Sequence, residues 1–474
     1  MRKNRRKFAI KQRKRYLFIF LFFVLCLGIG YSLFQTELGI GGTLLLNGYH
    51  GAEPIIQTTT SSDRTAFRSD TYREKIKIIN FSNTINPPAN AVESWDIGVA
   101  QNGNVMAYIT TNQANNSYYD LYIQGDGHLY ANENSSYLFY NLKGVDSITG
   151  IDNLDISKVR NMSHMFHSTG ESSTTLTLDL GNNFDTTDVT DMSSMFYSTG
   201  YNSTTFTLNL GDKFDTSNVT NMSSMFRTTG YKSTVFTLDL GDKFDTTNVT
   251  NMSSMFSSTG YTNTSFTLDL GDKFDTSNVT NMNYMFSSVG YNSNSIELNL
   301  GDKFDTSNVT NMACMFYNSG YNSSSFTLDL GSNFDTSSVT TMSYMFSGAG
   351  YKNTAFTLDL KDKFDTSNVT NMASIFSGTG YTNTSFTLNL GNKFNTSKVT
   401  DMTYMMGSVG YNNRTLEIDL GDIDFSSVTS YSGIFYNYRT TQKIYVANST
   451  AQQWIINNSG NSNLTTSNVL IKGA

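Results

Sequence analysis

The sequence has very few of the residues that cross-link a chain or carry out catalysis. Only two of its 474 residues are cysteine, and one of them, Cys26, stands in an apolar N-terminal run. An intramolecular disulfide with Cys314 is therefore excluded, and the fold must be held together by packing alone. The four histidines, His50, His128, His164 and His167, take part in no Ser-His-acid or metal-ligand spacing. We accordingly expect no enzyme activity, no metal and no cofactor.

Positive charge is also scarce outside the first few residues. The chain has 32 Lys and Arg against 39 Asp and Glu, and nine of the basic residues lie in residues 1–15. The remainder has 23 basic and 39 acidic side chains, which gives it a net charge of −16. Its basic residues are scattered rather than gathered into a stripe, so nucleic acid is excluded as a partner.

The first 34 residues combine this basic cluster with an apolar run. Residues 16–34 are almost wholly apolar, and this run is long enough to span a bilayer with little tilt. Positive charge before such a span is typical of a signal anchor whose basic end stays in the cytoplasm. The alternative is a secretory signal peptide with residues 17–27 as its apolar core. We expect residues 1–34 to be an uncleaved membrane anchor, or the protein to be secreted if the segment is cleaved.

What the sequence has in abundance is a repeat. The segment FDTSNVTNMSSMF at residues 214–226 recurs in close copies across the C-terminal two-thirds of the chain, with a 30-residue period. A period in this range indicates a solenoid, a propeller or an array of small units. The phenylalanine that opens each copy recurs at this constant spacing, at Phe184, Phe214, Phe244, Phe274, Phe304, Phe334, Phe364 and Phe394.

One repeat, residues 201–230, predicts a strand followed by a short helix. Phe206, Leu208 and Leu210 alternate with polar residues, which is typical of a half-buried strand. A Thr-Ser-Asn cluster then predicts a helix N-cap, and Gly230 predicts a left-handed stop. Between these two signals the apolar residues have the spacing of one helix face, at Val219, Met222, Met225 and Phe226.

Neighbouring repeats must share their cores. A single repeat buries too few apolar side chains to offset the conformational entropy lost when it becomes ordered, so it cannot fold alone. Stacked repeats can share one continuous core and a parallel ladder of strands about 4.8 Å apart. We therefore predict a curved rod of stacked coils, in which residues at equal repeat positions line up in columns.

The FDTSNVTNMSSMF segment and its period resemble the repeat of the BspA-like leucine-rich-repeat surface proteins of bacteria. The resemblance implies an α/β solenoid, a leucine-rich-repeat-like right-handed coil with one short parallel strand and one short helix or 3₁₀ turn per 30-residue repeat, flanked by small β-rich caps. It also implies an extracytoplasmic protein that is associated with adhesion and has no catalytic activity. Two features depart from the family pattern: an asparagine is missing at its usual offset from Leu208, and each repeat carries an inserted Gly-Tyr segment.

Changes of composition divide the rest of the chain. Residues 35–62 predict a spacer, and residues 63–138, with alternating apolar runs and a Gly-Asp-Gly hairpin turn at 125–127, predict a β-rich N-terminal cap. Residues 139–436 form the predicted leucine-rich-repeat-like solenoid. Residues 437–474 hold two strand-like runs around a short helical one and predict a C-terminal cap.

The outward side chains of the strand column are the candidate binding face. On a solenoid they form two parallel rows on the concave face, which such folds commonly use for partners. The alternative is a solvated sheet face in which Thr supplies β propensity and Asn separates stacked Asp residues. The near-identity of the repeats favours this alternative. The candidate residues are Thr207, Asn209, Thr237, Asp239, Thr267, Asp269, Glu297, Asn299, Thr327, Asp329, Thr357 and Asp359.

Three further columns admit both a functional and a structural interpretation. The Asp after each repeat Phe, as at Asp185, suggests calcium, but the nine-residue glycine-rich repeat of calcium-binding β-rolls is absent, so we interpret these residues as turn starters. The paired methionines are interpreted as core fillers. The last column suggests a platform for sugars, but we interpret it as packing at each helix end, and it comprises Tyr201, Tyr231, Tyr261, Tyr291, Tyr321, Tyr351, Tyr381 and Tyr411.

Together these features predict an exported bacterial surface protein. We expect its solenoid to act as a binding or adhesion scaffold for a protein or glycan on host, matrix or neighbouring cells, with a membrane contact through the N-terminal segment. The alternative is a structural spacer or cell-envelope component without a specific ligand.

Overall fold

The structure is a computed structural model that describes residues 52–234, 236–271 and 273–473, and of residues 265, 267 and 269 it describes the backbone alone. The chain divides into two compact units, Met1–Ala52 and Glu53–Ala474, and the second contains the repeats and both caps. The predicted anchor in residues 1–34 lies outside the described residues. Among the residues that are described, no helix combines the length and the hydropathy that a bilayer crossing requires.

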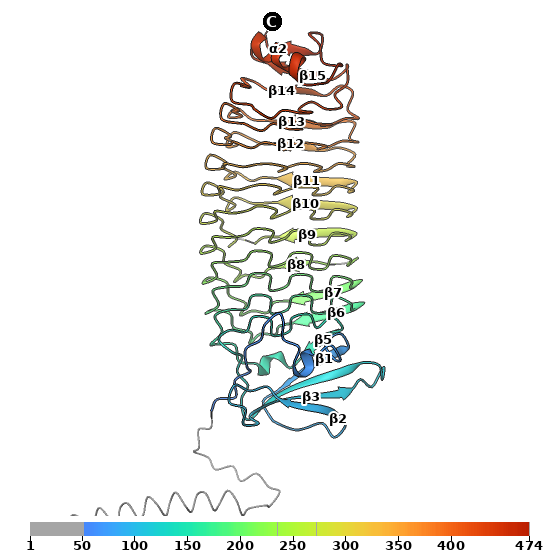
Figure 1. The fold of residues 1–474 in the computed structure, drawn as a ribbon, viewed down its shortest axis with the longest axis vertical. Helices are drawn as coiled ribbons and strands as arrows, with labels where there is room; N and C mark the ends of the chain where they lie inside the picture. The colour runs from blue at the N-terminus through green and yellow to red at the C-terminus, as the bar shows by residue number, and fades with distance from the viewer. Residues whose placement is uncertain (1–51, 235, 272, 474) are drawn as a thin grey trace, which may run out of the picture. The chain divides into compact units, whose positions relative to one another are not determined.

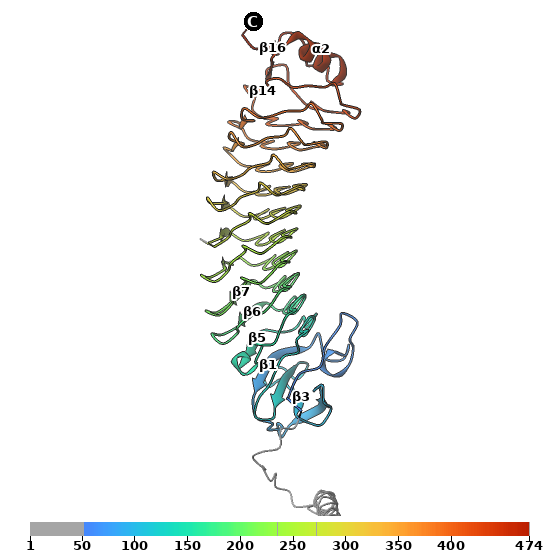
Figure 2. The same cartoon turned by 90° about the vertical axis from the view of Figure 1, so that its left-hand side faces the viewer.

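The repeats form coils that are stacked in a column with only a slight bend, so the strand face is close to flat (Figures 1 and 2). Each coil contributes one short strand, and successive strands pair in parallel at equal repeat positions, as Thr177 pairs with Thr207. The described residues therefore form a repeat solenoid. The strands of the column are β5 (Ser147–Thr149), β6 (Thr175–Asp179), β7 (Thr205–Asn209), β8 (Leu238–Asp239), β9 (Ser265–Asp269), β10 (Ser295–Asn299), β11 (Ser325–Asp329), β12 (Thr357–Asp359), β13 (Thr387–Asn389) and β14 (Glu417–Asp419).

The predicted alternation of these strands is confirmed. Exposed and buried side chains alternate along β7 and β10. Leu208 is 7% exposed, whereas Thr207 and Asn209 beside it face solvent. The period of two in the sequence thus identifies the inner and outer rows of the sheet correctly.

The sequence predicts a short helix or a 3₁₀ turn for each repeat; the helix is wrong, and the bond typical of a 3₁₀ turn recurs only in single turns. Residues 222–229 form a chain of overlapping β-turns in which every second N–H group donates three residues back, as Arg227 N does to Ser224 O at 3.2 Å. The N–H groups between them donate to the next coil, as Phe226 N does to Met255 O at 2.9 Å. No helix is assigned to the described residues of 154–436. We call these segments the turn ridge, which comprises residues 161–170, 191–200, 221–230, 251–260, 281–290, 311–320, 341–350, 371–380 and 401–410.

Left-handed backbone explains why the ridge is not helical. Ser224 and Thr228 have φ angles of 57° and 54°, which no right-handed helix contains. Gly230 closes the segment with a φ of 58°, as the sequence predicts, and a Cβ there would lie 2.8 Å from the Phe236 ring. The inward residues predicted for a helix face are nevertheless fully buried, and they are Val219, Met222, Met225 and Phe226.

Aromatic columns fill the core between the sheet and the turn ridge. Phe226 is stacked between Phe196 and Phe256, with ring centroids 5.5 and 5.8 Å apart and ring planes within 6° of parallel. A second column includes Phe214 and Phe244, whose centroids are 6.4 Å apart. Most coils repeat these contacts, and Met406 takes the place of the ring after Phe376, so one apolar core runs through the stack.

Buried hydroxyl groups join neighbouring coils. Thr229 is fully buried, and its Oγ1 donates to the carbonyl of Phe196 at 2.7 Å. Thr216 belongs to the cluster predicted as a helix N-cap, but its buried Oγ1 donates instead to the carbonyl of Asp245 in the next coil, at 2.7 Å. These bonds satisfy polar groups inside the core and tie the coils to one another.

The N-terminal cap continues the strand column. Its strands β1 (Ile76–Ser82), β2 (Ala91–Asp96), β3 (Val105–Thr111) and β4 (Tyr119–Gly125) lie in the order β2-β3-β4-β1, and β1 pairs in parallel with β5 of the first coils. β2–β3 and β3–β4 are both antiparallel hairpins, with loops at residues 97–104 and 112–118. The hairpin predicted at 125–127 is wrong, because this turn ends β4 and leads to an isolated parallel bridge at Tyr130.

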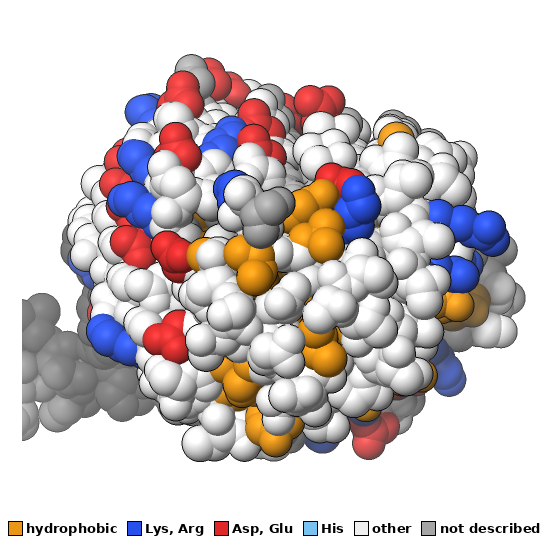
Figure 3. Space-filling model, turned by 90° about the horizontal axis from the view of Figure 1, so that it is seen from above, with side chains coloured by type: hydrophobic (Ala, Val, Ile, Leu, Met, Phe, Trp, Pro, Cys, Tyr) orange, Lys and Arg blue, Asp and Glu red, His pale blue; other side chains and the backbone are white. Residues whose placement is uncertain are grey.

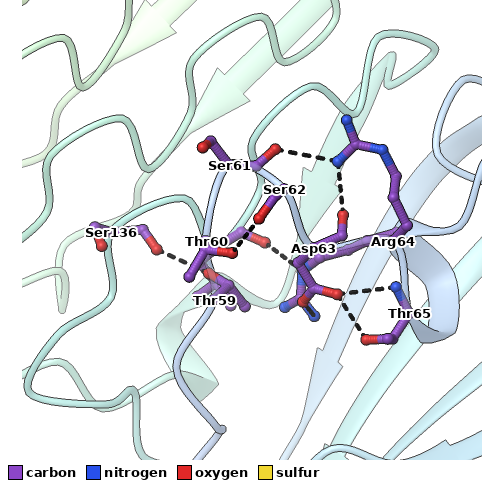
Figure 4. Close-up of polar contacts among 10 residues, drawn as sticks. Thr59, Thr60, Ser61, Ser62, Asp63, Arg64, Thr65 and Ser136 are labelled. Atoms are coloured by element: carbon purple, nitrogen blue, oxygen red, sulfur yellow. Dashed lines mark hydrogen bonds and ion pairs between the residues drawn. The ribbon is translucent and has the colours of Figure 1, made fainter.

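Residues 53–62 of the predicted spacer pack against this cap. Ile56 is fully buried and forms a bridge with Gly98. Thr59 Oγ1 donates to the carbonyl of Ser136 at 2.8 Å, as Figure 4 shows. A 3₁₀ turn, η1 (Ala66–Arg68), follows directly, and a second one, η2 (Ile151–Asn153), lies where the cap meets the coils.

The C-terminal cap has the two strands and the short helix that the sequence predicts. They are β15 (Lys443–Val446), α2 (Ser449–Asn458) and β16 (Val469–Ile471), and both strands extend the β14 edge in parallel. Asn448 caps α2 by accepting from the N–H of Ala451 at 2.9 Å. Trp454 of α2 stacks on Phe425 with centroids 3.8 Å apart, and so closes the end of the core.

Candidate binding faces

The predicted candidate residues lie on one face, in two columns along the strands. Ten of them are exposed, and of Thr267 and Asp269 only the backbone is described. The structure thus brings the Thr and Asp/Asn residues together as expected. The exposed ones are Thr207, Asn209, Thr237, Asp239, Glu297, Asn299, Thr327, Asp329, Thr357 and Asp359.

The Asp/Asn column also has a structural task. Asp239 Oδ1 accepts from the N–H of Gly241 at 2.9 Å, and Asn299 does the same for Gly301 at 3.0 Å. The accepting residue starts a turn in which Gly241 has a φ of 73°, a conformation that glycine adopts without strain. Asp and Asn both serve here because each offers the same oxygen. The column is therefore repeated for a reason that requires no ligand.

Neighbouring members of this column also bond to one another. Asn209 Nδ2 donates to Asp179 at 3.0 Å, so an amide separates two acidic coils. The Lys361 ammonium lies 2.7 Å from Asp329 Oδ1, and this hydrogen bond is the main cause that lowers the pKa of Asp329. By contrast, the outer threonine hydroxyls of the neighbouring column lie on the exposed face of the sheet.

Shallow hollows lie beside the glycine turns, at the edge of the strand face. A hollow of about 620 Å³ near the C-terminal end is lined by residues that include Asn389, Asn392, Lys393, Asp419 and Lys472. Smaller ones of about 340 and 250 Å³ recur further down the stack beside Gly241 and Gly331. Each contains both acidic and basic side chains. Figure 3, which views the C-terminal end, shows charged side chains of both signs gathered along one side of that end.

The tyrosine column at the Gly-Tyr segments is a continuous stack. Tyr231 and Tyr261 have centroids 4.3 Å apart and planes 12° from parallel, and the same contact recurs from Tyr201 to Tyr411. Burial and the stacked neighbours raise the pKa of Tyr351 to about 12. Each ring face inside the stack is already covered by the next ring, so this column presents ring edges. The packing interpretation fits this geometry better than a sugar platform does.

Sequence reasoning missed a second set of tyrosines, on the turn ridge. The ridge position of Ser224 holds Tyr in three other coils, and Tyr284, Tyr344 and Tyr404 are 42%, 44% and 41% exposed. Tyr317 meets the Tyr344 ring edge-on with centroids 6.3 Å apart. Tyr436 meets the Tyr404 ring in the same way at 5.9 Å. We call these five residues the tyrosine strip; four of them lie on the turn ridge, and Tyr436 lies in the coil that follows its last segment. In the sequence these residues can be recognised only because tyrosine replaces the residue that other coils have at the same repeat position.

A histidine pair occupies the N-terminal end of the turn ridge. The Nδ1 atoms of His164 and His167 lie 3.1 Å apart, and Tyr137 stacks on the His164 ring with centroids 4.7 Å apart. Burial, with the His164 charge as a second cause, lowers the pKa of His167 from 6.5 to about 4. Burial also lowers the pKa of His164. Both rings therefore stay neutral at physiological pH.

Within residues 52–473, apart from the undescribed positions, no group of three or more His, Cys, Asp or Glu side chains converges as a metal site would require. Asp185, from the column considered for calcium, accepts from the N–H of Thr187 at 3.1 Å, as a turn starter does. The hydrogen bond from the Thr187 hydroxyl is the main cause that lowers the pKa of Asp185. Cys314 is a buried free thiol on the turn ridge.

Comparison with known proteins identifies the family of the repeats. The chain matches no curated protein and no solved structure. One family model, described as "Mycoplasma protein of unknown function, DUF285", matches residues 133–265, 201–320, 231–356, 289–416 and 350–467. These overlapping stretches span both the coils and most of the C-terminal cap. Since they cover more than half of the chain, the protein belongs to this DUF285 family of repeat proteins.

Proposed function

We propose that the protein is an exported bacterial surface protein whose stacked coils act as a binding or adhesion scaffold. The observation that carries this proposal is the strand face, where exposed groups such as Thr237, Thr327 and Thr357 recur at the coil spacing over the length of the stack. An extended partner makes many weak, equal contacts with such a surface, and their sum gives avidity without any single strong site. The partner class is a protein or glycan on host, matrix or neighbouring cells.

Export and anchoring are part of the same proposal. The nine basic residues of 1–15 and the apolar run at 16–34 support an anchor in the cytoplasmic membrane with the coils outside. Protease treatment of intact cells, followed by N-terminal sequencing of the released fragment, tests this arrangement. A fragment that begins beyond residue 34 agrees with it, and a chain that is digested only after lysis contradicts it.

The remaining parts of the proposal concern the coil type and chemistry. We propose that the coil is a variant of the leucine-rich-repeat type in which β-turns replace the helical side. The resemblance of the FDTSNVTNMSSMF segment supports this assignment. We also propose that the protein has no catalytic role, which the scarcity of histidine and cysteine supports.

Charge substitution on the Thr column tests the binding face. Thr237, Thr327 and Thr357 are changed together to Glu, a residue that Glu297 already supplies at this repeat position and that the coil therefore accommodates. We expect binding to whole cells or to immobilised matrix proteins to fall at least about tenfold, because charges placed within a contact face disrupt it. The matched control changes the same three residues to Ser. Unchanged binding of the Glu variant would remove the strand face from the proposal.

A second candidate function is a spacer without a specific ligand. The structural task of the Asp/Asn column favours it, since that column is explained by turn formation alone. Deleting residues 231–260, one full period, keeps the register of all remaining coils. A spacer responds to this change of length and ignores the Glu substitutions, whereas a binding scaffold shows the opposite response.

A further inference from the structure

We propose that the tyrosine strip is a self-association surface through which two copies of this chain pair by their turn ridges. The strip consists of Tyr284, Tyr317, Tyr344, Tyr404 and Tyr436. This surface is separate from the strand face, so the inference extends the proposed function and does not depend on it.

The coil does not require tyrosine at these positions, although Tyr284 forms a side-chain hydrogen bond with Cys314 and the Tyr404 ring lies against Gly433 of the next coil. Ser194, Ser224, Ser254 and Ser374 occupy the same repeat position as Tyr344, with φ angles of 54–57° against 60°. A bulky residue at positive φ is a marked outlier, and such outliers concentrate at functional sites. The ring of Tyr344 also stays 44% exposed, so burial does not account for its presence. A role outside the coil accounts for the part of the ring that stays exposed.

Three of the five strip residues, Tyr284, Tyr317 and Tyr344, lie in an uncharged part of an acidic molecule, whereas Asp401 lies in the segment of Tyr404 and Arg439 lies near Tyr436. The ridge segments 251–260, 281–290, 311–320, 341–350 and 371–380 contain no Asp, Glu, Lys or Arg. The protein beyond residue 15 has a net charge of −16, so two copies repel each other wherever their acidic surfaces meet. These five segments of the turn ridge let them approach without that repulsion. Exposed tyrosine with little charge is also the composition that distinguishes protein interfaces.

The spacing of the rings points to a second copy as the partner. Tyr284, Tyr344 and Tyr404 are separated by two repeat periods each, so they stand on every second coil. Successive coils are about 4.8 Å apart, which separates these rings by about 10 Å along the stack. Cys314 and Ser374, the small residues between them, are 7% and 6% exposed. A partner must repeat with this period to meet all three rings, and another copy of the chain has it by construction. Two-fold pairing is the usual form of such contacts.

Replacement of the three alternate rings tests the proposal. The full chain in detergent micelles is compared by sedimentation velocity, over a concentration series, with a Tyr284→Ser, Tyr344→Ser, Tyr404→Ser variant. The folded coil tolerates these changes because serine is native at the same repeat position in other coils. We expect the parent to dimerise and the variant to dimerise at least about 100-fold more weakly, since buried aromatic anchors dominate interface affinity.

Matched controls separate this surface from the strand face and from the N-terminal segment. Thr237→Ser, Thr327→Ser, Thr357→Ser on the strand face should leave dimerisation unchanged, and both triple variants retain residues 1–34. A parent that is monomeric at every concentration, or a Tyr→Ser variant that still dimerises like the parent, overturns the proposal. Cell and matrix binding are measured in parallel, so that loss of binding by a still-dimeric protein is recognised as a failure of the strand face alone.

Discussion

The strand face and the turn ridge have the same 30-residue period but use it in opposite ways. On the strand face, each coil presents Thr or Glu beside Asp or Asn, and the second of these starts the glycine turn. On the turn ridge, the backbone bonds are the repeated part, and the side chain at one repeat position changes from Ser224 to Tyr284 to Cys314. A column of residues that stays the same from coil to coil can therefore be explained by what the coil needs in order to fold. Where the side chain varies on a constant backbone, the coil does not dictate the residue. The residue at an individual coil is then either free to change or selected for another role.

The largest difference in the free energy of unfolding is expected between a substitution in the core and one on the surface of the turn ridge. Phe256→Ala removes a fully buried ring that is stacked between Phe226 and Phe286, and we expect it to lower the free energy of unfolding by about 3–5 kcal/mol. Tyr344→Ser, on the exposed ridge, should change it by less than about 0.5 kcal/mol. Urea denaturation of the full chain in micelles measures both. Equal effects would mean that the ridge tyrosines are structural and that the contrast between core and ridge is wrong.

A pH series is expected to show the next largest effect, confined to one end of the ridge. Burial depresses the pKa of His167 to about 4, so between pH 6.5 and 4 the unfolded chain binds a proton that the folded chain does not. The free energy of unfolding is therefore complete above pH 6.5 and falls as the pH approaches 4. The double variant His164→Ser, His167→Tyr copies the next coil, which has Ser194 and Tyr197. In this variant the decrease in the free energy of unfolding that is due to histidine should disappear, and only the acid unfolding due to carboxylates should remain.

Substitutions of a buried and of an outer threonine should differ by a smaller amount in their effect on the free energy of unfolding. Thr229→Val removes the buried hydroxyl that bonds to the Phe196 carbonyl, and we expect a loss of about 1 kcal/mol. The same carbonyl also accepts from the N–H of Thr199, which limits the loss. Thr237→Val on the strand face should be neutral or slightly stabilising, because valine suits an exposed strand position equally well. Thermal unfolding of the two variants side by side gives the comparison, and a larger loss for Thr237→Val would contradict it.

The smallest change in stability is expected in the Asp/Asn column, where two substitutions distinguish the contribution of the turn hydrogen bond from that of the charge. Asp239→Ala loses the bond to the Gly241 N–H and should destabilise the coil by about 0.5–1 kcal/mol. Asp239→Asn keeps an oxygen in the same place, as Asn209 and Asn299 do, and should be close to neutral. Equal stability of the Ala and Asn variants in chemical denaturation would show that the turn bond contributes nothing.

The sequence predicted the parts of the fold that depend on burial. The alternation around Leu208, the register of the repeats and the two strands and helix of the C-terminal cap were all readable, because each is set by which side chains avoid water. The helix was not, since Val219, Met222, Met225 and Phe226 have the same inward spacing in a chain of β-turns. A helix and a chain of β-turns differ here in the backbone hydrogen bonds to the next coil, and these bonds do not affect the hydrophobic periodicity of the sequence.

The candidate site was only partly predictable for a related reason. The outward position of Asp239 follows from the period of two, but its bond to Gly241 needs the turn geometry. The tyrosine strip was missed because the repeats were compared for what they share. Aligning them for their differences singles out Tyr284, Tyr344 and Tyr404, and it also shows that Tyr is absent from that position in the coils that hold Ser194, Ser224 and Ser254.

The two-sided bonding of the coils has a mechanical consequence. Each coil is held to its neighbour by strand bonds on one side and by turn-ridge bonds on the other, and every interface is nearly a copy of the next. When the ends of the stack are pulled apart, such interfaces yield one after another at similar forces. Each event releases one repeat period, which extends to about 100 Å. The stack of coils would thus lengthen in equal steps and absorb work at each of them.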